Sequence, residues 1–227
     1  MKSSTLVFFV AATVLSAGCA NPERSRNLAD PNVSATTLAQ QVCSNCHGIT
    51  GSAVSPNFPN LAGQIEPYFV AQLTGFKSHS RQDPAGFEYM WGLSRHLTDD
   101  QVKGLAAYYA AQPPTVQAIE GDHARLDAGK SIFEAGVADK GVPACVSCHG
   151  DKGQGQATFP RIAGQHADYL VKQLMVFQRT DERPDGSVMK TVAHELTRQN
   201  IDDVAGYLQA LPSLSVDGLG GLEFGAG

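Results

Sequence analysis

The stretch Cys43-Ser-Asn-Cys46-His47 recurs in the second half of the chain as Cys145-Val-Ser-Cys148-His149. Both stretches have the C-x-x-C-H pattern of covalent haem attachment, in which two cysteine thiols add to the haem vinyl groups as thioethers. The histidine after the second cysteine then lies under the iron as an axial ligand. The sequence therefore predicts two haem c groups, bound by Cys43 and Cys46 and by Cys145 and Cys148, with His47 and His149 on the irons.

Other uses of paired cysteines fit this chain less well. A zinc site normally needs a second Cys or His pair at short range, which neither half offers. A thioredoxin-like redox pair needs a βαβ context, which the sequence lacks. Of the five cysteines only Cys19 lies outside the two motifs, so the folded domains keep no cysteine for a disulfide or a thiolate nucleophile.

The N-terminus is typical of an export signal. Lys2 supplies a positive charge, and the uncharged run from Leu6 to Ala17 is shorter than the roughly 20 residues that span a bilayer. The run ends in Leu-Ser-Ala-Gly-Cys19, which resembles a bacterial lipobox except that serine stands where leucine is usual. We expect a signal peptide over residues 1–19, lipidation of Cys19, a flexible polar tether over 20–33, and a periplasmic protein anchored to a bacterial membrane. Ordinary cleavage with an incidental Cys19 is the alternative.

The body of the chain is an internal duplication. The stretch Phe58–Gln64 returns as Phe159–Gln165, and Leu97-Thr98 returns as Leu196-Thr197. The offset between the copies drifts from 102 residues at the cysteines (145 − 43) to 99 at the Leu-Thr pair (196 − 97), which small loop insertions explain. We expect domain 1 over residues 34–112, a linker over 113–121 that begins with Pro113-Pro114, domain 2 over 122–212, and a flexible Gly-rich tail over 213–227.

The residue pattern predicts helices and no strands. Ser34 can cap a helix that runs into Cys43, and Asp122 can cap the matching helix before Cys145. Pro67 suits the first turn of a helix that continues to Phe76, with its copy over 167–177. A capping box at Thr98–Gln101 opens the last helix of domain 1, and the last helix of domain 2 starts at Thr197.

The duplication also selects the sixth ligand of each iron. Met90 lies seven residues before Leu97, and Met189 lies seven residues before Leu196. Met175 and the remaining histidines do not recur, so we interpret Met175 as core filler and those histidines as surface residues. A His/Met pair leaves no open position on the iron, which favours reversible one-electron transfer and argues against a small-molecule substrate there.

Five further residues are candidates for contacts around the haems. Pro59 and Pro160 follow the motif histidines by 12 and 11 residues, so their carbonyls can accept from the second ring nitrogen of each histidine. Arg81 and Arg183 precede the methionines and can pair with haem propionates, as can Arg161. Ordinary turns and solvated surface arginines are the alternatives.

With these features the chain resembles the cytochrome c4 family, the two-domain, di-haem class I cytochromes of bacterial respiratory chains. The resemblance covers about Leu28 to Leu211 and rests on both C-x-x-C-H sites, the repeated F-P-x-[LI]-A-G-Q stretch and the methionine before Leu-Thr. It implies an all-α fold of two tandem class I cytochrome c domains, packed about a pseudo-twofold axis. It also implies electron transfer between a quinol-oxidising complex and a terminal oxidase or reductase.

We interpret the chain as an electron carrier and not as an enzyme. A di-haem peroxidase needs an iron that can open a coordination position, and both methionines argue against that. A thiosulfate-oxidising cytochrome with a thiolate ligand needs a spare cysteine, which neither domain has. A permanent cytochrome subunit of a larger dehydrogenase or oxidase complex, or a di-haem peroxidase-like enzyme, stays an alternative. With a formal net charge of −5 at pH 7, the chain lacks the basic excess of a nucleic-acid-binding protein.

Overall fold

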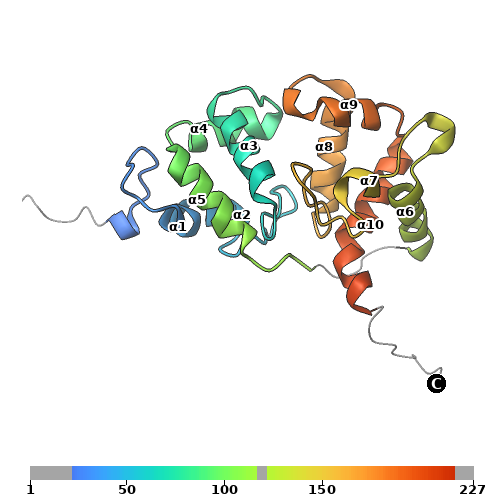
Figure 1. Cartoon of the computed structure of the whole chain (residues 1–227), viewed down its shortest axis with the longest axis horizontal. Coiled ribbons are helices and arrows are strands. Elements are labelled where there is room, and N and C mark those ends of the chain that lie inside the picture. Colours follow the sequence, from blue (N-terminus) through green and yellow to red (C-terminus); the bar gives the residue numbers. More distant parts are fainter. Residues whose placement is uncertain (1–21, 117–121, 218–227) are drawn as a thin grey trace, which may run out of the picture.

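Two helical domains lie side by side in the computed structural model, which describes residues 22–116 and 122–217 and side chains as far as Leu211. Domain 1 runs from blue to green and domain 2 from yellow to red (Figure 1). Among the described residues the only β-structure is two isolated bridges, between Val137 and Val142 and between Gln156 and Phe159. The expectation of an all-α fold is confirmed.

The elements follow a similar order in the two domains. Domain 1 contains η1 (Pro22–Arg24), α1 (Ala35–Leu38), η2 (Ala39–Cys43), α2 (Ser44–His47), α3 (Glu66–Lys77), η3 (Gly86–Met90), α4 (Trp91–Ser94) and α5 (Asp99–Ala110). Domain 2 contains α6 (His123–Ala135), η4 (Ala138–Lys140), α7 (Val146–His149), α8 (Ala167–Arg179), η5 (Pro184–Gly186), α9 (Ser187–His194) and α10 (Arg198–Asp217). In the repeat, α2 corresponds to α7, α3 to α8 and α5 to α10.

Local side chains determine where several helices begin, as predicted. The Ser34 hydroxyl accepts from the Thr37 N–H ahead of α1, and the Asp122 carboxylate accepts from the Ala124 N–H ahead of α6. Thr98 forms the expected capping box with the residue three positions later at the start of α5. The elements α1, η2 and α2 then follow one another without a gap, so the first helix reaches the first cysteine motif.

Domain 2 departs from this plan before its cysteine motif. Helix α6 ends at Ala135, and Gly136 continues with φ of 74°. A Cβ on Gly136 would lie 2.2 Å from the Val142 carbonyl oxygen, so the turn requires glycine. A loop that contains η4 separates α6 from Cys145, whereas the matching helix of domain 1 reaches its cysteine directly.

Each domain packs its first helix closely against its last. A Cβ on Gly104 of α5 would lie 2.6 Å from the Ala35 Cβ of α1, and a Cβ on Gly129 of α6 would lie 2.1 Å from the Asp203 carbonyl oxygen of α10. The two glycines therefore let the helices approach at nearly backbone distance. Each domain has its own apolar core, in which Tyr109 and Phe133 are completely buried.

The end of the predicted tether packs against domain 1. Val33 is 1% exposed, Leu28 contacts the core, and Gln101 Nε2 donates to the Val33 carbonyl at 2.8 Å. Any flexible part of the tether expected over 20–33 therefore ends before residue 28. At the other end α10 continues to Asp217, so the start of the tail predicted over 213–227 is helical. The signal segment with Cys19, residues 117–121 of the linker and residues 218–227 lie outside the described residues.

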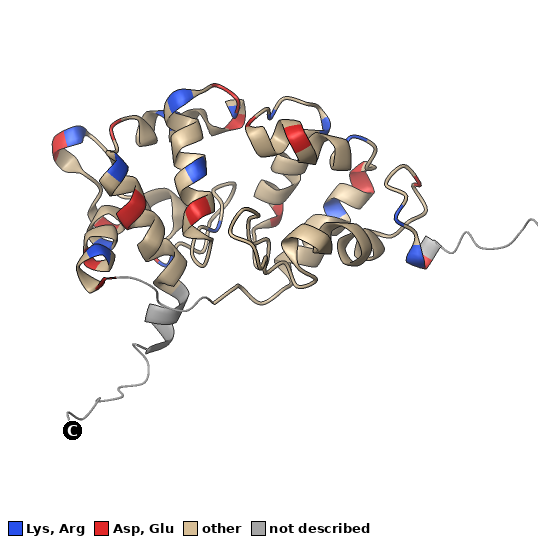
Figure 2. Ribbon diagram, turned by 180° about the vertical axis from the view of Figure 1, so that it is seen from behind, with Lys and Arg blue, Asp and Glu red and all other residues tan. Residues whose placement is uncertain are grey.

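Charged residues of both signs are interspersed along both domains in the view of Figure 2. This mixture accompanies the modest net charge of −5 for the whole chain. Within residues 22–116 and 122–217, no helix has both the length and the apolar character needed to cross a bilayer.

The close contact between α6 and α10 gives a test of the fold. We expect Gly129→Ala to lower the free energy of unfolding by about 1–3 kcal/mol, because the added methyl overlaps the α10 backbone. Gly206→Ala in α10 is the matched control, since its Cβ meets no atom within 4 Å, and it should stabilise by about 0.5–1 kcal/mol. Denaturant unfolding followed by circular dichroism measures both. Equal effects from the two variants would contradict the packing described.

Candidate functional site

Each C-x-x-C-H stretch occupies about one turn of helix. Cys43 ends η2, Cys46 and His47 lie in α2, and domain 2 repeats the arrangement around α7. Residues three apart on a helix lie on the same face, so the two thiols of each motif project together. All four cysteines of the two motifs are of intermediate exposure. Two neighbouring vinyl groups of one haem require this placement.

The motif histidines are buried and oriented in the same way. His47 Nδ1 lies 2.9 Å from the Pro59 carbonyl oxygen, and His149 Nδ1 lies 2.9 Å from the Pro160 carbonyl oxygen. Burial lowers the pKa of both histidines and outweighs the opposite effect of these hydrogen bonds. The rings are therefore neutral, Nδ1 carries the proton that the carbonyl accepts, and the Nε2 lone pair stays free for a metal.

The phenylalanine before each proline completes this contact. Phe58 meets His47 edge to face at 6.2 Å between ring centroids, and Phe159 meets His149 in the same way at 6.2 Å. The repeated Phe-Pro pair thus supports each imidazole with one ring and one carbonyl. This arrangement gives the repeat of Phe-Pro in the sequence a physical reason.

The thiols are poorly suited to the alternative chemistries. Burial raises the pKa of Cys43 and of Cys145 to about 11, so these groups stay protonated near neutral pH. A redox dithiol needs the thiolate, so this pKa disfavours a redox pair. Among the described residues no group of three or more His, Cys, Asp or Glu side chains is placed to bind a metal ion. Attachment of haem as thioethers fits these thiols best.

Met90 and Met189 lie at matching places in the repeat but in different elements. Met90 is the last residue of η3 and packs against the domain 1 core, whereas Met189 lies inside α9. The segments follow α3 and α8, respectively, and precede the Leu-Thr pair of their domain. Met175, which has no counterpart, packs against the domain 2 core, and its sulfur lies 3.7 Å from Arg198 Nη1.

The three arginines predicted near propionates differ in their bonding. Arg81 donates from Nε and Nη2 to the two carboxylate oxygens of Asp83, at 2.7 and 3.1 Å. Burial acts to raise the pKa of Asp83, but the hydrogen bonds and charge of Arg81 outweigh it and the pKa falls below its ordinary value. The Nε–H groups of Arg161 and Arg183, in contrast, are buried and have no hydrogen-bond partner among the described residues. Because an unpaired buried donor is costly, these two groups fit an anionic group that the polypeptide does not supply.

The sequence reasoning missed Gln72 and Gln173, and it did not foresee that Arg81 and Arg183 help to join the two domains. Gln72 Oε1 accepts from Arg81 Nη1 at 2.5 Å and from Arg183 Nη2 at 3.0 Å. Gln173 Oε1 accepts from Arg183 Nη1 at 2.5 Å and from Arg81 Nη2 at 3.3 Å. All four side chains are buried, and exchanging the domains reproduces the pattern. The sequence signal that could have identified them is a glutamine at the same position of α3 and α8, among apolar residues.

The expectation that the remaining histidines lie at the surface is wrong for His166. This residue is 8% exposed, and its Nε2 lies 3.0 Å from the Ala53 carbonyl oxygen of domain 1. It therefore belongs to the interface between the domains. His79 also has a buried Nε2, and its ring stacks on Trp91 at 4.8 Å between centroids.

The comparisons with known proteins agree on one family. The cytochrome c family model matches residues 34–111 and 126–212. Cytochrome c-552 of Acidithiobacillus ferridurans is 41% identical over 170 residues, which cover 74% of this chain and 73% of the relative. Cytochrome c4 of Azotobacter vinelandii is 36% identical over 179 residues, covering 75% and 84%. The crystal structure of reduced recombinant cytochrome c4 from Pseudomonas stutzeri matches with a TM-score of 0.70 and 34% identity, covering 80% of this chain and 98% of that one.

A second group of relatives carries a different name. The thiosulfate dehydrogenase electron acceptor of Stutzerimonas stutzeri (strain A1501) is 32% identical over 173 residues. The match covers 74% of this chain and 78% of that relative.

The two motifs should bind haem independently, because each domain carries a full set of thiols and a histidine. Replacing Cys43 and Cys46 together by serine is expected to leave one covalently bound haem per chain, as is replacing Cys145 and Cys148. Mass spectrometry of the denatured chain measures the haem content. Ser44→Ala, between the cysteines of the first motif, is the control and should keep two haems. Loss of both haems from one double variant would contradict independent sites.

Proposed function

The chain belongs to the cytochrome c family, as a two-domain member of the cytochrome c4 type, and we propose that it carries electrons in the periplasm between a quinol-oxidising complex and a terminal oxidase or reductase. It is an electron-transfer protein with two covalently bound haem c groups. The observation that carries the proposal is the recurrence of one ligand set. Each domain has a C-x-x-C-H turn, a proline carbonyl 2.9 Å from the histidine Nδ1, and a methionine at the matching position.

The side chains have distinct tasks in this proposal. Bound haem supplies the reversible exchange of one electron between ferrous and ferric iron. The cysteines of each motif attach the group, and the histidine presents Nε2 because its Nδ1–H is held by the proline carbonyl. Met90 and Met189 would each supply a second protein ligand to the iron of their domain, which would leave no position there for a substrate. Arg161 and Arg183 would hold the haem propionates through their unpaired Nε–H groups.

Removal of each methionine tests the ligand assignment. We expect Met90→Ala and Met189→Ala each to abolish half of the charge-transfer absorption from methionine sulfur to ferric iron in the oxidised protein, since one haem loses its thioether. Met175→Ala removes a methionine that packs in the core and should retain the full absorption. Full absorption in Met90→Ala or in Met189→Ala would refute the assignment of that residue, because another methionine would then have to bind the iron.

The relatives named as acceptors of thiosulfate dehydrogenase favour a second candidate function. In this alternative the protein is a cytochrome subunit that receives electrons from a dehydrogenase within a lasting complex. Purification of the protein from its native membranes separates the two functions. A stoichiometric dehydrogenase partner would support the subunit, whereas isolation of the cytochrome alone would support the mobile carrier.

The surfaces beside the two methionines differ, which supports separate routes for electrons in and out. Beside Met90, Phe87 and Tyr89 are each 60% exposed. Beside Met189, Val188 is 58% exposed and Lys190 forms a surface ion pair with Asp181. A surface with two aromatic rings and a surface with an aliphatic side chain and an ion pair suit different partners, and redox partners usually meet through small, weak interfaces. We assign one partner to each face.

Charge reversal tests these separate routes. Arg95→Glu lies close in sequence to Met90, and Lys190→Glu is adjacent to Met189. We expect each variant to slow exchange with one partner by about tenfold and to leave the other partner's rate unchanged, because electrostatic complementarity acts mainly on association. Stopped-flow reduction by the quinol-oxidising complex and oxidation by the terminal oxidase measure the two rates. Equal slowing of both partners by one variant would contradict separate routes.

Attachment to the membrane is proposed through Cys19. The apolar run before it and the lipobox-like sequence support export and lipidation. A lipid on Cys19 would keep the carrier close to membrane-bound partners, and this part of the chain stays a prediction from the sequence.

A further inference from the structure

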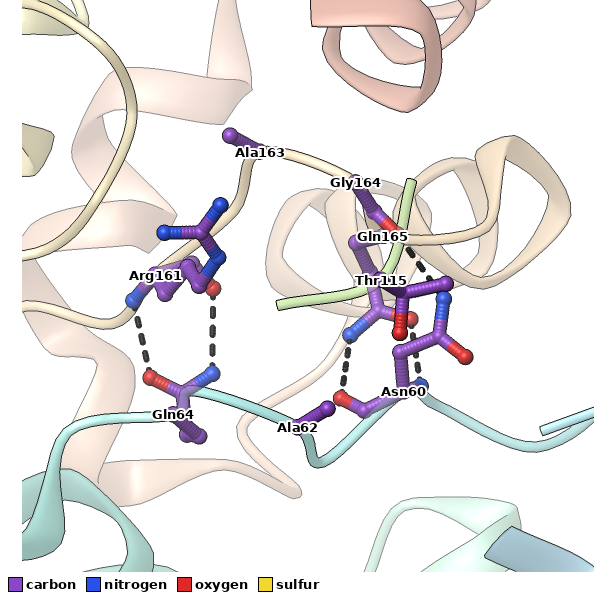
Figure 3. Close-up of a pocket in the computed structure, with 8 residues that line it drawn as sticks. All are labelled: Asn60, Ala62, Gln64, Thr115, Arg161, Ala163, Gly164 and Gln165. Carbon is purple, nitrogen blue, oxygen red and sulfur yellow. Dashed lines mark hydrogen bonds between the residues drawn. The ribbon is translucent and has the colours of Figure 1, made fainter. Parts of the chain in front are cut away.

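A single peptide group connects the first motif histidine to the opposite domain. The carbonyl oxygen of the Pro59–Asn60 peptide lies 2.9 Å from His47 Nδ1, and the N–H of the same peptide donates at 2.7 Å to Oε1 of Gln165 in domain 2. Gln165 Nε2 also donates to the Asn60 carbonyl at 3.0 Å, so this side chain holds the backbone at two points (Figure 3).

The second motif histidine has the reciprocal connection. The carbonyl oxygen of the Pro160–Arg161 peptide lies 2.9 Å from His149 Nδ1, and the N–H of that peptide donates at 2.8 Å to Oε1 of Gln64 in domain 1. Gln64 Nε2 donates to the Arg161 carbonyl at 3.0 Å, as Figure 3 shows beside the first pair. Each domain therefore contributes a glutamine to the histidine environment of the other.

Both glutamines are enclosed by the interface. Gln64 and Gln165 are each 7% exposed, so water cannot readily replace the amide. Asn60 is held further, because its side chain donates to the Gly164 carbonyl at 2.8 Å and accepts from the Ala53 N–H at 2.8 Å. The peptide groups that orient the histidines thus acquire their full set of hydrogen bonds only when the domains are docked.

We infer that Gln64 and Gln165 are positioning residues that tune the iron site of the opposite domain. The inference rests on the proposed histidine ligation. A peptide whose N–H donates to an acceptor is polarised, so its carbonyl becomes a stronger acceptor. A stronger acceptor on Nδ1–H makes the imidazole more basic at Nε2, which favours ferric iron. Gln165 therefore lowers the reduction potential of the domain 1 haem, and Gln64 lowers that of the domain 2 haem.

The test is a Gln165→Met variant of the full chain with both haems bound. We expect an upward shift in the potential of the domain 1 haem and no comparable shift in the other. Redox titration followed through the NMR signals of the haem methyl groups resolves the two haems, and the variants that lack one cysteine pair assign them. Gln64→Met should shift the domain 2 haem instead, and it provides the test if Gln165→Met fails to fold.

Two further variants separate tuning from a loosened interface. Gln165→Glu keeps an acceptor for the Asn60 N–H, so the potential of the domain 1 haem should stay at or below the wild-type value. Gln173→Met is the control for a loosened interface and is compared at the domain 1 haem. It removes hydrogen bonds between the domains without touching either histidine-bound peptide, and the haem contact that it disturbs is the one proposed for Arg183 of domain 2. A shift of the domain 1 haem in Gln173→Met equal to that in Gln165→Met, an equal shift of both haems in Gln165→Met, or no shift in Gln165→Met would overturn the inference. Absence of two reversible couples in the wild-type protein would instead overturn the carrier function itself.

Discussion

Each iron site depends on the hydrogen bond from a buried histidine Nδ1 to a proline carbonyl, at 2.9 Å in both domains. This bond selects the tautomer that leaves Nε2 free, and burial keeps the ring neutral. Helix α2 or α7 positions the ring, and the loop before α3 or α8 supplies the carbonyl. The histidine and the carbonyl that orients it, 12 residues apart in domain 1 and 11 in domain 2, come from separate segments that the domain core and interface hold together.

The sequence predicted those features that depend on neighbouring residues or that recur in both domains. Ser34, Asp122 and Thr98 cap helices as predicted, because a cap acts within three residues. Comparison of the two halves could identify equivalent residues, such as the two prolines that lie against the motif histidines. The separation from cap to first cysteine, 9 residues from Ser34 to Cys43 and 23 from Asp122 to Cys145, reveals an insertion in domain 2. Comparison of the halves could not show that the insertion forms a loop, because it has no counterpart in domain 1.

Contacts between the domains could not be predicted from the sequence, for a different reason. Gln64 and Gln165 were visible as repeated residues, but a repeat does not say whether a residue serves its own domain or the opposite one. His166 was placed at the surface because it does not recur, yet it is buried against Ala53. A duplicated sequence thus displays the residues of a shared interface without displaying the pairing, which depends on how the two copies dock.

The reciprocal pattern of the interface has a consequence for the history of the chain. If the two domains are exchanged, the hydrogen bond from the Arg161 N–H to Gln64 becomes the hydrogen bond from the Asn60 N–H to Gln165. Such a self-complementary interface is the geometry of a twofold homodimer. An ancestral single domain with these residues would have formed each contact twice, and fusion of two gene copies would preserve the assembly in one polypeptide. After fusion the copies were free to diverge, and the charge partners have done so. Asp83 is almost fully buried against Arg81, whereas the side chain of its counterpart Asp185 is 40% exposed and lies 3.9 Å from Arg183.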